Sequence, residues 1–337
     1  MGDNVTPVKA RVVSGMRPTG RLHLGHLVGA LNNWVSLQDQ YECLYFVADW
    51  HALTSEYAGT DDVAGYAYSN VADWIAAGLD PEKCTIFVQS LVPEHAELHL
   101  LLSMIIPVPW LERVPTYKEL REQLTEKDLS TYGFLGYPLL QTADIIMYDA
   151  QYVPVGEDQV PHLELSREVV RRFHTFYGQV FVEPQPLLTR FPRLPGLDNR
   201  KMSKSYGNAI DLADDAETVR KKVMSMYTDP ARIRADIPGN VEGNPVFMYH
   251  DAFNPNKDEV DDLKARYRAG KVGDVEVKRK LIAALELTLE PMRERRASLL
   301  ATPERLREIV EEGSRRARAS AKETMARVRS AMKLSYS

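Results

Sequence analysis

The sequence predicts an α/β protein with a large domain built on a doubly wound, Rossmann-like parallel sheet, followed by a C-terminal helical domain. Short apolar strands alternate with helical patterns between residues 10 and 155, and only helical spacing remains after Ser205. Such alternation is typical of parallel sheets, which bind ligands beyond the carboxyl ends of their strands. The segments 15–26 and 49–51 fall at such ends.

The first half of the pattern begins with a predicted strand at 10–14, followed by a turn rich in glycine and proline at 15–21. Apolar residues then recur at helical spacing from Gly25 to about residue 40, which predicts a helix. Residues 44–48 have the sequence Leu-Tyr-Phe-Val-Ala, a continuous apolar run that is typical of a buried strand.

The next elements continue the alternation. A helix is predicted over 61–77, because Gly78 follows at the position where helices favour glycine. Strands are predicted at 85–88 and 152–155. Between them, residues 107–145 are punctuated by prolines and are expected to form an insertion in this layout.

Helical patterns at 216–226, 277–289 and 304–333 dominate the rest of the chain, which indicates two domains, 1–205 and 206–337. The sequence leaves open whether the last helix packs back on the first domain. Its basic residues are typical either of a solvated helix face or of a surface that binds RNA. These residues are Arg305, Arg307, Arg315, Arg316, Arg318, Lys322, Arg327, Arg329 and Lys333.

The composition is that of an ordinary soluble protein, with 337 residues, 44% of them hydrophobic and 26% charged, and a net charge of -5. Mild acidity does not exclude nucleic acid, because local clusters of basic residues decide binding. Cys43 and Cys84 are too few for a disulfide framework or a CxxC metal site, which fits a reducing cytoplasm. No apolar run approaches the roughly 18–20 residues of a membrane span, and no signal-peptide pattern is present.

The turn after the first strand has two possible uses. Residues 15–20 have the outline of a GxxxxG phosphate loop, but Arg21 follows where that loop needs lysine, which excludes it. The string from His23 to His26, with Gly25 between them, instead places two imidazoles at a helix start whose amides favour phosphate. Taken alone, such a string is more often just a capped helix start. Its position directly after the first strand favours the other interpretation, a site that binds phosphate.

A second string, Lys-Met-Ser-Lys-Ser at 201–205, lies in a loop bounded by 195–196 and 207–208. Two lysines three positions apart provide positive charge where negative charge develops in phosphoryl transfer. A basic surface loop explains the two lysines equally well if they are taken alone.

Together and in this order, the two strings resemble the ATP-binding signatures of class I aminoacyl-tRNA synthetases. The stretch Val-Pro-Val-Gly-Glu-Asp-Gln at 153–159, with 14–30, 47–52 and 137–148, narrows the resemblance to the tryptophanyl-tRNA synthetases. This resemblance implies ATP-dependent formation of tryptophanyl-adenylate and its transfer to tRNA(Trp). The rivals are a non-tRNA adenylyltransferase of the same superfamily and a synthetase-like regulator without catalysis.

The resemblance also implies an ATP site, with Mg²⁺ held more by the phosphates than by protein carboxylates, so that no metal ligand is assigned. The expected catalytic residues are His26, Lys201 and Lys204. The full set of expected ATP-binding residues is Arg17, Pro18, Thr19, His23, Gly25, His26, Gly156, Glu157, Asp158, Leu194, Lys201, Met202, Ser203, Lys204 and Ser205.

An amino-acid pocket is expected at Tyr137, Gln141 and Asp144, whose spacing places all three on one helix face. By the resemblance, Gln159 and Gly15 face the same pocket. Asp144 is the expected acceptor for the indole N–H of tryptophan, a group that only donates. The structural alternative for Asp144 is an ion pair with a nearby arginine.

Gln141 also raises the tyrosyl-tRNA synthetases as an alternative, because many tryptophanyl enzymes carry methionine there. Tyrosyl enzymes place a tyrosine on the first strand, where this chain has Val13, and favour Gly-Gly-x-x-Gln where it has the sequence at 155–159. Val13 leaves room for an indole and offers no partner for a phenol hydroxyl. The sequence therefore favours tryptophan.

The resemblance extends to partners and cofactors. Some relatives hold an iron–sulfur cluster through cysteines in the helical domain, but Asp274 and Val277 stand about where a CxxC would be, so no cluster is expected. A homodimer is implied, with 107–145 at or near the interface. L-tryptophan and tRNA(Trp) are the implied partners, and 206–337 is the implied anticodon-binding domain.

Overall fold

The centre of the molecule is a parallel sheet in the strand order β3-β2-β1-β4-β5. Its strands are β1 (Arg11–Met16), β2 (Glu42–Val47), β3 (Cys84–Val88), β4 (Tyr152–Val155) and β5 (Gln185–Leu188). The chain runs outward from β1 to β3 and returns to place β4 on the other side of β1. This reversal creates a topological switch point between β1 and β4, where sheets of this type bind ligands. The predicted fold class is confirmed.

The computed structural model describes residues 9–115, 117–118, 129–188, 194–202, 206–229, 232 and 234–336. The expected site residues Ser203, Lys204 and Ser205 lie outside the described residues, as does the side chain of Asp158.

The predicted strands lie within one or two residues of the observed ones, apart from β5, which the sequence did not indicate. β5 has the sequence Gln-Pro-Leu-Leu and pairs only with β4 among the described strands. Pro186 cannot donate to a ladder and suits an edge strand. Four residues with a proline and little alternation carry too weak a periodic signal to predict a strand.

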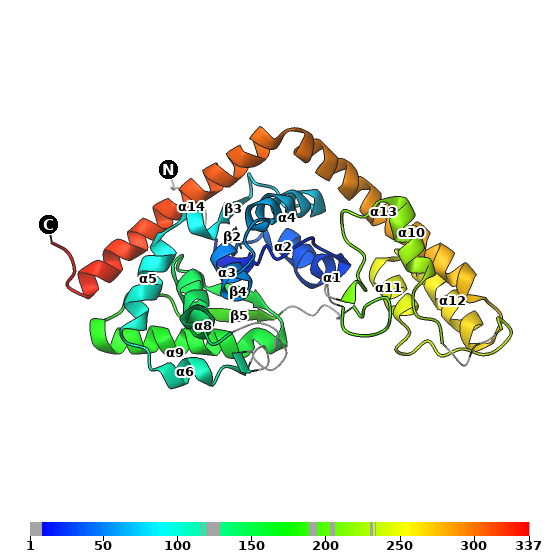
Figure 1. Ribbon diagram of the computed structural model, residues 1–337, viewed down its shortest axis with the longest axis horizontal. Helices are drawn as coiled ribbons and strands as arrows, with labels where there is room; N and C mark the ends of the chain where they lie inside the picture. Colours follow the sequence, from blue (N-terminus) through cyan, green and yellow to red (C-terminus); the bar gives the residue numbers. More distant parts are fainter. Residues whose placement is uncertain are drawn as a thin grey trace, which may run out of the picture.

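Alternate residues of the strands face two separate cores, as the period of two in a strand requires. Val12, Tyr45 and Ile86 belong to one core, whereas Val13 and Phe46 belong to the other. The first core extends under α2 (Asn32–Leu37) and α4 (Val63–Ala77) and into the C-terminal helices. The second lies under α5 (Glu94–Ser103), α8 (Tyr132–Ile146) and α9 (Val160–Tyr177). The sheet is therefore covered on both faces (Figure 1).

The helix predicted from Gly25 differs in detail from the observed one. It begins as α1 (Leu24–His26), widens into a π-helical turn at Leu27–Leu31 and ends with α2 at Leu37. By contrast, α4 ends as predicted at Gly78, whose φ of 118° is the left-handed conformation that glycine adopts without strain.

The helical layer on the second core includes most of the predicted insertion. It consists of α5 (Glu94–Ser103), α6 (Val108–Glu112), α8 (Tyr132–Ile146) and α9 (Val160–Tyr177), with α3 (Asp49–Glu56) leading from β2 toward α8. In Figure 1, α8 and α9 lie beneath the sheet beside α6. Residues 132–146 are thus an integral part of this layer, and 116 and 119–128 lie outside the described residues.

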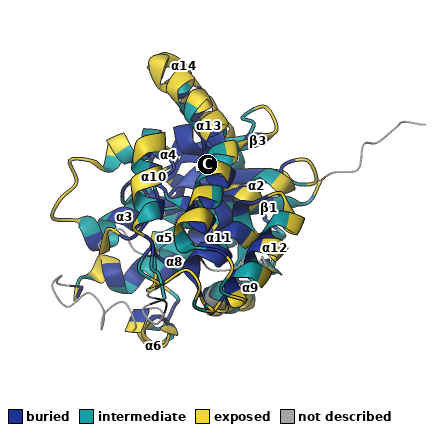
Figure 2. Cartoon of the chain, turned by 90° about the vertical axis from the view of Figure 1, so that its right-hand side faces the viewer, coloured by how far each residue is buried: buried dark blue, intermediate teal, exposed yellow. Residues whose placement is uncertain are grey.

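The C-terminal part is helical, with α10 (Ala216–Met224), α11 (Pro245–Phe253), α12 (Lys257–Arg268), α13 (Asp274–Ala301) and α14 (Pro303–Ala331). α13 runs from this group to α4, and α14 then crosses the molecule along β3 and α5 (Figure 1). One side of α14 is buried, and its outer side is exposed to solvent (Figure 2).

The basic run on α14 has a use that the sequence did not reveal. Arg318 contacts Glu94 at 3.0 Å, Arg329 donates to Glu97, and Arg327 donates to Asp149. Arg316 donates to the backbone oxygens of Pro81 and Cys84. These arginines therefore attach α14 to the sheet domain, a role that neither alternative from the sequence included.

Gly313 allows α14 to approach β3 closely. A Cβ at this position would lie 1.8 Å from the backbone oxygen of Ile86 and 2.7 Å from its carbonyl carbon. Gly313→Ala is therefore expected to destabilise the protein by about 1–3 kcal/mol through overpacking, although alanine is the better helix former. Urea unfolding followed by circular dichroism measures the change.

Gly65 provides the matched control on α4, because it is exposed and no atom lies within 4 Å of its Cβ position. Gly65→Ala is expected to raise stability by up to about 1 kcal/mol. Equal stabilisation by Gly313→Ala would show that α14 does not lie against β3 as described.

Candidate active site

A cavity of about 470 Å³ opens at the switch point, between the carboxyl ends of the strands and α8. Its position is the one expected for a ligand in this fold. The lining residues are Val13, Ser14, Gly15, Met16, Arg17, Thr19, His26, Phe46, Ala48, His51, Thr54, Phe134, Tyr137, Gln141, Asp144, Ile145, Val153, Pro154, Val155, Gly156, Gln159 and His162.

Nine residues expected at the site from the sequence line this cavity together. They are Gly15, Arg17, Thr19, His26, Tyr137, Gln141, Asp144, Gly156 and Gln159. The other described candidates lie outside its lining: Pro18, His23, Gly25, Glu157, Leu194, Lys201 and Met202. Leu194 is buried in the first core, so its expected contact with adenine stays a prediction.

The two histidines after the first strand cap the start of α1. The Nδ1 atom of His23 accepts the backbone N–H of Gly25 at 3.1 Å, and the Nδ1 atom of His26 accepts that of His23 at 3.1 Å. The two rings lie 3.8 Å apart between centroids. Because Nδ1 accepts in both rings, the donor of each neutral imidazole is Nε2. The capped helix start is therefore observed, and the phosphate site stays a prediction.

The two signature strings meet in space. A Cβ on Gly25 would lie 3.0 Å from the sulfur of Met202 and 3.0 Å from the ring of His23, so glycine is needed for this approach. The backbone N–H of Leu24 donates to the oxygen of Ile210, and that of Leu212 to the oxygen of Leu22. The segment that follows the Lys-Met-Ser-Lys-Ser string is thereby joined to the first string.

The base of that loop is held by Asn208. Its Nδ2 atom donates to Oδ1 of Asp198 at 2.8 Å and to the backbone oxygen of Lys201 at 3.1 Å. Hydrogen bonds from Asn208 and, to a lesser extent, from Arg200 lower the pKa of Asp198 to about 2. Gly196 permits the turn, because a Cβ there would lie 2.2 Å from Nδ2 of Asn208. The lysine side chain at 201 is exposed.

The part of the cavity where an amino-acid pocket is expected is built on α8. The N-cap of this helix is Thr131, whose hydroxyl accepts the backbone N–H of Phe134. Tyr137, Gln141 and Asp144 project from this helix into the cavity, as their spacing predicts. Val13 lines the same cavity from β1. Tyr137 packs on His162, with 5.8 Å between ring centroids.

Gly15 and Phe46 form one wall of this pocket. A Cβ on Gly15 would lie 2.4–2.8 Å from atoms of the Phe46 ring. The ring therefore occupies the place of a side chain at residue 15, and any larger residue there has to displace it from the cavity wall.

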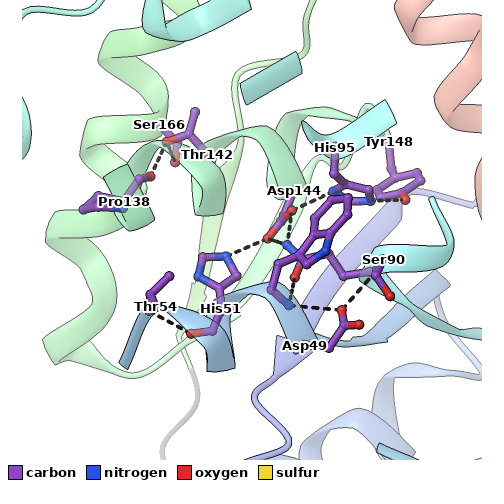
Figure 3. Close-up of polar contacts among 12 residues, drawn as sticks. Asp49, His51, Thr54, Ser90, His95, Pro138, Thr142, Asp144, Tyr148 and Ser166 are labelled. Atoms are coloured by element: carbon purple, nitrogen blue, oxygen red, sulfur yellow. Dashed lines mark hydrogen bonds and ion pairs between the residues drawn. The ribbon is translucent and has the colours of Figure 1, made fainter. Parts of the chain in front are cut away.

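Asp144 accepts hydrogen bonds from three buried side chains (Figure 3). Nε2 of His51 lies 2.9 Å from Oδ2, and Nδ1 of His95 lies 2.6 Å from Oδ1. Nε2 of Gln89 lies 2.8 and 2.9 Å from the two oxygens. The structural alternative for Asp144 was an ion pair with an arginine. Among the described residues, its partners are instead two histidines and a glutamine.

The carboxylate of Asp144 is ionised despite being 1% exposed. Burial alone raises its pKa, but the charge of His95 and the hydrogen bonds from His51 and His95 outweigh this effect and lower the pKa to about 2. The cavity therefore contains a fixed, ionised acceptor at neutral pH.

His51, Gln89 and His95 were not among the predicted site residues. Each follows the carboxyl end of a strand, His51 after β2 and the other two after β3. A polar residue directly after a buried strand was the available signal for Gln89, and it was used for the turn at 49–51 but not there. His95 lies farther on, within α5, and carries no such signal.

Asp274 and Val277, the positions compared above with a CxxC, lie in the first turn of α13. Asp274 accepts a hydrogen bond from Tyr267 at 2.8 Å and pairs with Arg232 at 3.0 Å, and Val277 is buried in the first core. The guanidinium of Arg232 lies 3.9 Å from the centre of the Tyr267 ring and donates to the backbone oxygens of Ala235, Ile237 and Val272.

Arg232 therefore stabilises the turn before α11 and the start of α13. Arg232→Met is expected to lower stability by roughly 3 kcal/mol, because buried acceptors and Asp274 lose their partner. Urea unfolding tests this, with Arg234→Met as control. The pair of Arg234 with Asp236 is exposed, and its loss is expected to cost less than about 1 kcal/mol. Equal effects of the two variants would contradict the structural role of Arg232.

Two general features bear on function. No group of three or more histidine, cysteine, aspartate or glutamate side chains among the described residues is arranged to hold a metal ion. In the same part of the chain, no helix has both the length and the apolar character needed to cross a membrane.

Comparison with known proteins identifies the class. Residues 7–290 match the family of tRNA synthetases of class I for tryptophan and tyrosine (W and Y). This match covers most of the chain and includes both signature strings and the whole cavity. The chain belongs to the class I aminoacyl-tRNA synthetases of this family.

The most similar relatives distinguish the two amino acids. The chain is 50% identical to tryptophan–tRNA ligase of Thermotoga maritima, over 97% of this chain and 100% of the relative. It is 51% identical to tryptophan–tRNA ligase of Treponema pallidum, over 96% of this chain and 97% of the relative. The structure of tryptophanyl-tRNA synthetase from Campylobacter jejuni, complexed with ADP and tryptophan, superposes on this chain with a TM-score of 0.87 at 30% identity. The superposition covers 96% of this chain and 100% of that one. The chain is a tryptophan–tRNA ligase, as predicted, and the alternatives are not favoured.

Proposed function

We propose that the cavity at the switch point is the site where L-tryptophan and ATP react. The observation that carries this proposal is the position of Asp144, a buried and ionised acceptor, in a cavity that also contains His26. The first string that includes His26 touches the second string through Gly25 and Met202. An amino-acid acceptor and two phosphate-binding segments thus lie around one switch point.

In the tryptophan pocket, Asp144 accepts the indole N–H, and Tyr137, Gln141, Gln159 and Gly15 line the rest. Phenylalanine leaves this acceptor unpaired and is rejected for that reason. The rejection of phenylalanine by tyrosyl-tRNA synthetases, whose site binds a substrate hydroxyl, is the general example of this effect. Val13 offers no partner to a phenol hydroxyl, so tyrosine is also disfavoured.

The ATP site uses Arg17, Pro18, Thr19 and the histidines of the first string, with Gly156, Glu157, Asp158 and Leu194 completing the nucleotide pocket. Lys201 and Lys204, with Met202, Ser203 and Ser205, contact the phosphates. Mg²⁺ accompanies ATP and is held chiefly by the phosphates, since Mg²⁺ retains waters and takes few protein ligands in such sites.

The reaction has two steps. The tryptophan carboxylate attacks the α-phosphorus of ATP in line, and the bond to the leaving pyrophosphate breaks. The attacking carboxylate is already ionised, so this step needs no general base, and positioning and charge stabilisation provide the rate. A ribose hydroxyl at the 3′ end of tRNA(Trp) then attacks the tryptophanyl carbonyl, and AMP leaves.

ATP–pyrophosphate exchange with purified protein tests this proposal. Exchange driven by tryptophan, and far less by tyrosine, phenylalanine or no amino acid, is the expected result. Exchange driven by tyrosine would contradict the assignment of Val13 and Asp144. No exchange with any amino acid would favour a regulator or an adenylyltransferase that acts on another metabolite.

The helical region 206–337 is proposed to bind the anticodon of tRNA(Trp), and 1–205 to form the catalytic domain. The arginines of α14 that pair with Glu94, Glu97 and Asp149 are engaged within the chain, so tRNA contact falls to other basic residues of this region. The two buried, unpaired cysteines fit a cytoplasmic enzyme.

A homodimer is proposed through the outer surface of α5, α6, α8 and α9. Large apolar side chains are exposed there on neighbouring elements: Leu100, Met104, Val108, Tyr132 and Phe176 are between 50% and 69% exposed. Exposed apolar residues on adjoining helices mark protein interfaces more often than solvent-facing surface.

Analytical ultracentrifugation is expected to give twice the chain mass of 38.2 kDa. Met104→Glu is expected to shift the protein toward the monomer, because it buries a charge at the interface. Leu287→Glu is the control, since Leu287 is 67% exposed on α13, far from these helices in the fold. A monomeric wild-type protein would contradict the dimer.

A further inference from the structure

A buried chain of hydrogen bonds extends from Asp144 away from the cavity. Nδ1 of His95 lies 2.6 Å from Oδ1 of Asp144, and Nε2 of the same ring lies 2.6 Å from the hydroxyl of Tyr148 (Figure 3). His95 and Tyr148 are both 0% exposed. Neither lines the cavity, so neither is placed to contact a substrate there.

The direction of these hydrogen bonds follows from the groups involved. Burial raises the pKa of Tyr148 well above its usual value, so its hydroxyl keeps its proton. The ionised carboxylate of Asp144 can only accept, so Nδ1 of His95 carries a hydrogen. When the ring is neutral, Nε2 accepts the hydroxyl of Tyr148, and when the ring is protonated, Nε2 donates to that hydroxyl oxygen. In both forms Tyr148 holds the ring with its Nδ1–H toward Asp144.

The surroundings of His95 hold it in one place. Its ring packs near Phe46 and Phe87, with 6.1 and 6.2 Å between centroids, and its backbone N–H donates to the oxygen of Val92. In this apolar environment, rotation of the ring would leave a buried donor and a buried carboxylate unpaired, which is costly.

Hydrogen bonding also limits what Asp144 can still accept. A carboxylate has about four lone-pair directions. His51 and His95 each contact one oxygen of Asp144, and Nε2 of Gln89 lies within hydrogen-bonding distance of both. His51 and Asp144 line the cavity, whereas His95 is fully buried and lies outside the lining. The side of Asp144 that lines the cavity is the one that a ligand there can reach.

We propose that His95 is a positioning residue for substrate specificity: with Tyr148 behind it, it fixes the carboxylate of Asp144 so that one acceptor direction meets the indole N–H. This inference rests on the proposed function of the pocket. By this inference, the buried His95–Tyr148 pair helps the enzyme to distinguish two aromatic substrates of the same shape. One carries a ring N–H, and the other lacks it.

The test compares L-tryptophan with β-(3-benzothienyl)-L-alanine, in which sulfur replaces the ring N–H, as substrates for ATP–pyrophosphate exchange. Two variants separate the two nitrogens of His95. His95→Asn keeps an N–H donor near the place of Nδ1, and His95→Gln places its N–H donor near the place of Nε2. Both shorten the ring to an amide of similar polarity, so they form a matched pair.

The preference of the wild type for tryptophan, as a ratio of kcat/KM values, is expected to fall about tenfold in His95→Gln, the factor for one lost hydrogen bond to a charged group. His95→Asn is expected to keep this preference within about threefold. Tyr148→Phe preserves the ring shape and is expected to give an intermediate loss, which provides a second measurement if a variant at 95 does not fold.

Two results would overturn the inference. His95→Gln could keep the full preference, or both variants at 95 could lose activity toward the two substrates to the same extent, which is what a purely structural role predicts. Failure of the proposed function is a distinct outcome, since the wild type itself would then show no exchange with tryptophan.

Discussion

Asp144→Asn is expected to lower kcat/KM for tryptophan in ATP–pyrophosphate exchange by roughly 100-fold, the upper range for a buried hydrogen bond to a charged group. The amide retains one acceptor oxygen, and its NH₂ group points at donors from His51, His95 or Gln89. The one remaining carbonyl oxygen accepts hydrogen bonds from these protein donors. The indole N–H therefore loses its acceptor. Activity with phenylalanine, which offers no such donor, is expected to change much less.

The ratio of kcat/KM for tryptophan to that for phenylalanine is the decisive measurement, because a general loss of folding lowers both values. Asp149→Asn is the matched control. Asp149 follows α8, lies outside the cavity lining and pairs with Arg327 at 2.6 Å. Its φ of 51° is a conformation that asparagine tolerates well. An unchanged ratio in Asp144→Asn would show that another group recognises the indole.

The sequence was sufficient to predict the fold class, because periodicity and strand ends are local properties. β4 was predicted with its observed bounds, and Gly78 was identified as the end of α4. The predicted helix from Gly25 missed the π-helical turn at Leu27–Leu31, because the apolar spacing of the sequence does not distinguish it from an α-helical turn. β5 was missed because a four-residue edge strand with a proline has almost no pattern.

The sequence predicts which candidate residues lie together where a short motif or a helical spacing links them. Tyr137, Gln141 and Asp144 share one helix, so their common direction follows from the period of 3.6 residues. The partners of Asp144 come from other elements that meet only in the folded chain. Nothing local to Gln89 or His95 reveals that a carboxylate 55 or 49 positions later lies within hydrogen-bonding distance.

The same limit applies to α14. Its basic run is visible in the sequence, but the acidic partners Glu94, Glu97 and Asp149 lie on other parts of the chain. Gly313 likewise has no local reason to be glycine inside a helix, and only the contact with the backbone of Ile86 explains it.

Lys201→Ala and Lys204→Ala are each expected to slow formation of tryptophanyl-adenylate by roughly 10²–10³-fold, the range for loss of one group that stabilises developing charge. Negative charge moves to the leaving pyrophosphate in the transition state, so a lysine there acts on the rate. Tryptophan binding is expected to stay within about twofold, because the proposed acceptor for the indole is on α8 and not in this loop. Single-turnover formation of the adenylate and a separate titration with tryptophan measure the two effects.

Arg200→Ala is the matched control for Lys201→Ala, since it removes a neighbouring positive charge from the same loop. Arg200 pairs with Asp198 at 2.6 Å and lies 5.2 Å from the ring centre of Tyr206, so its charge is engaged within the loop. A large rate loss in all three variants would mean that loop integrity or general charge, not the lysines, limits the rate. An unchanged rate in both lysine variants would remove the second string from the proposed chemistry and leave the charge on pyrophosphate to Arg17 and Mg²⁺.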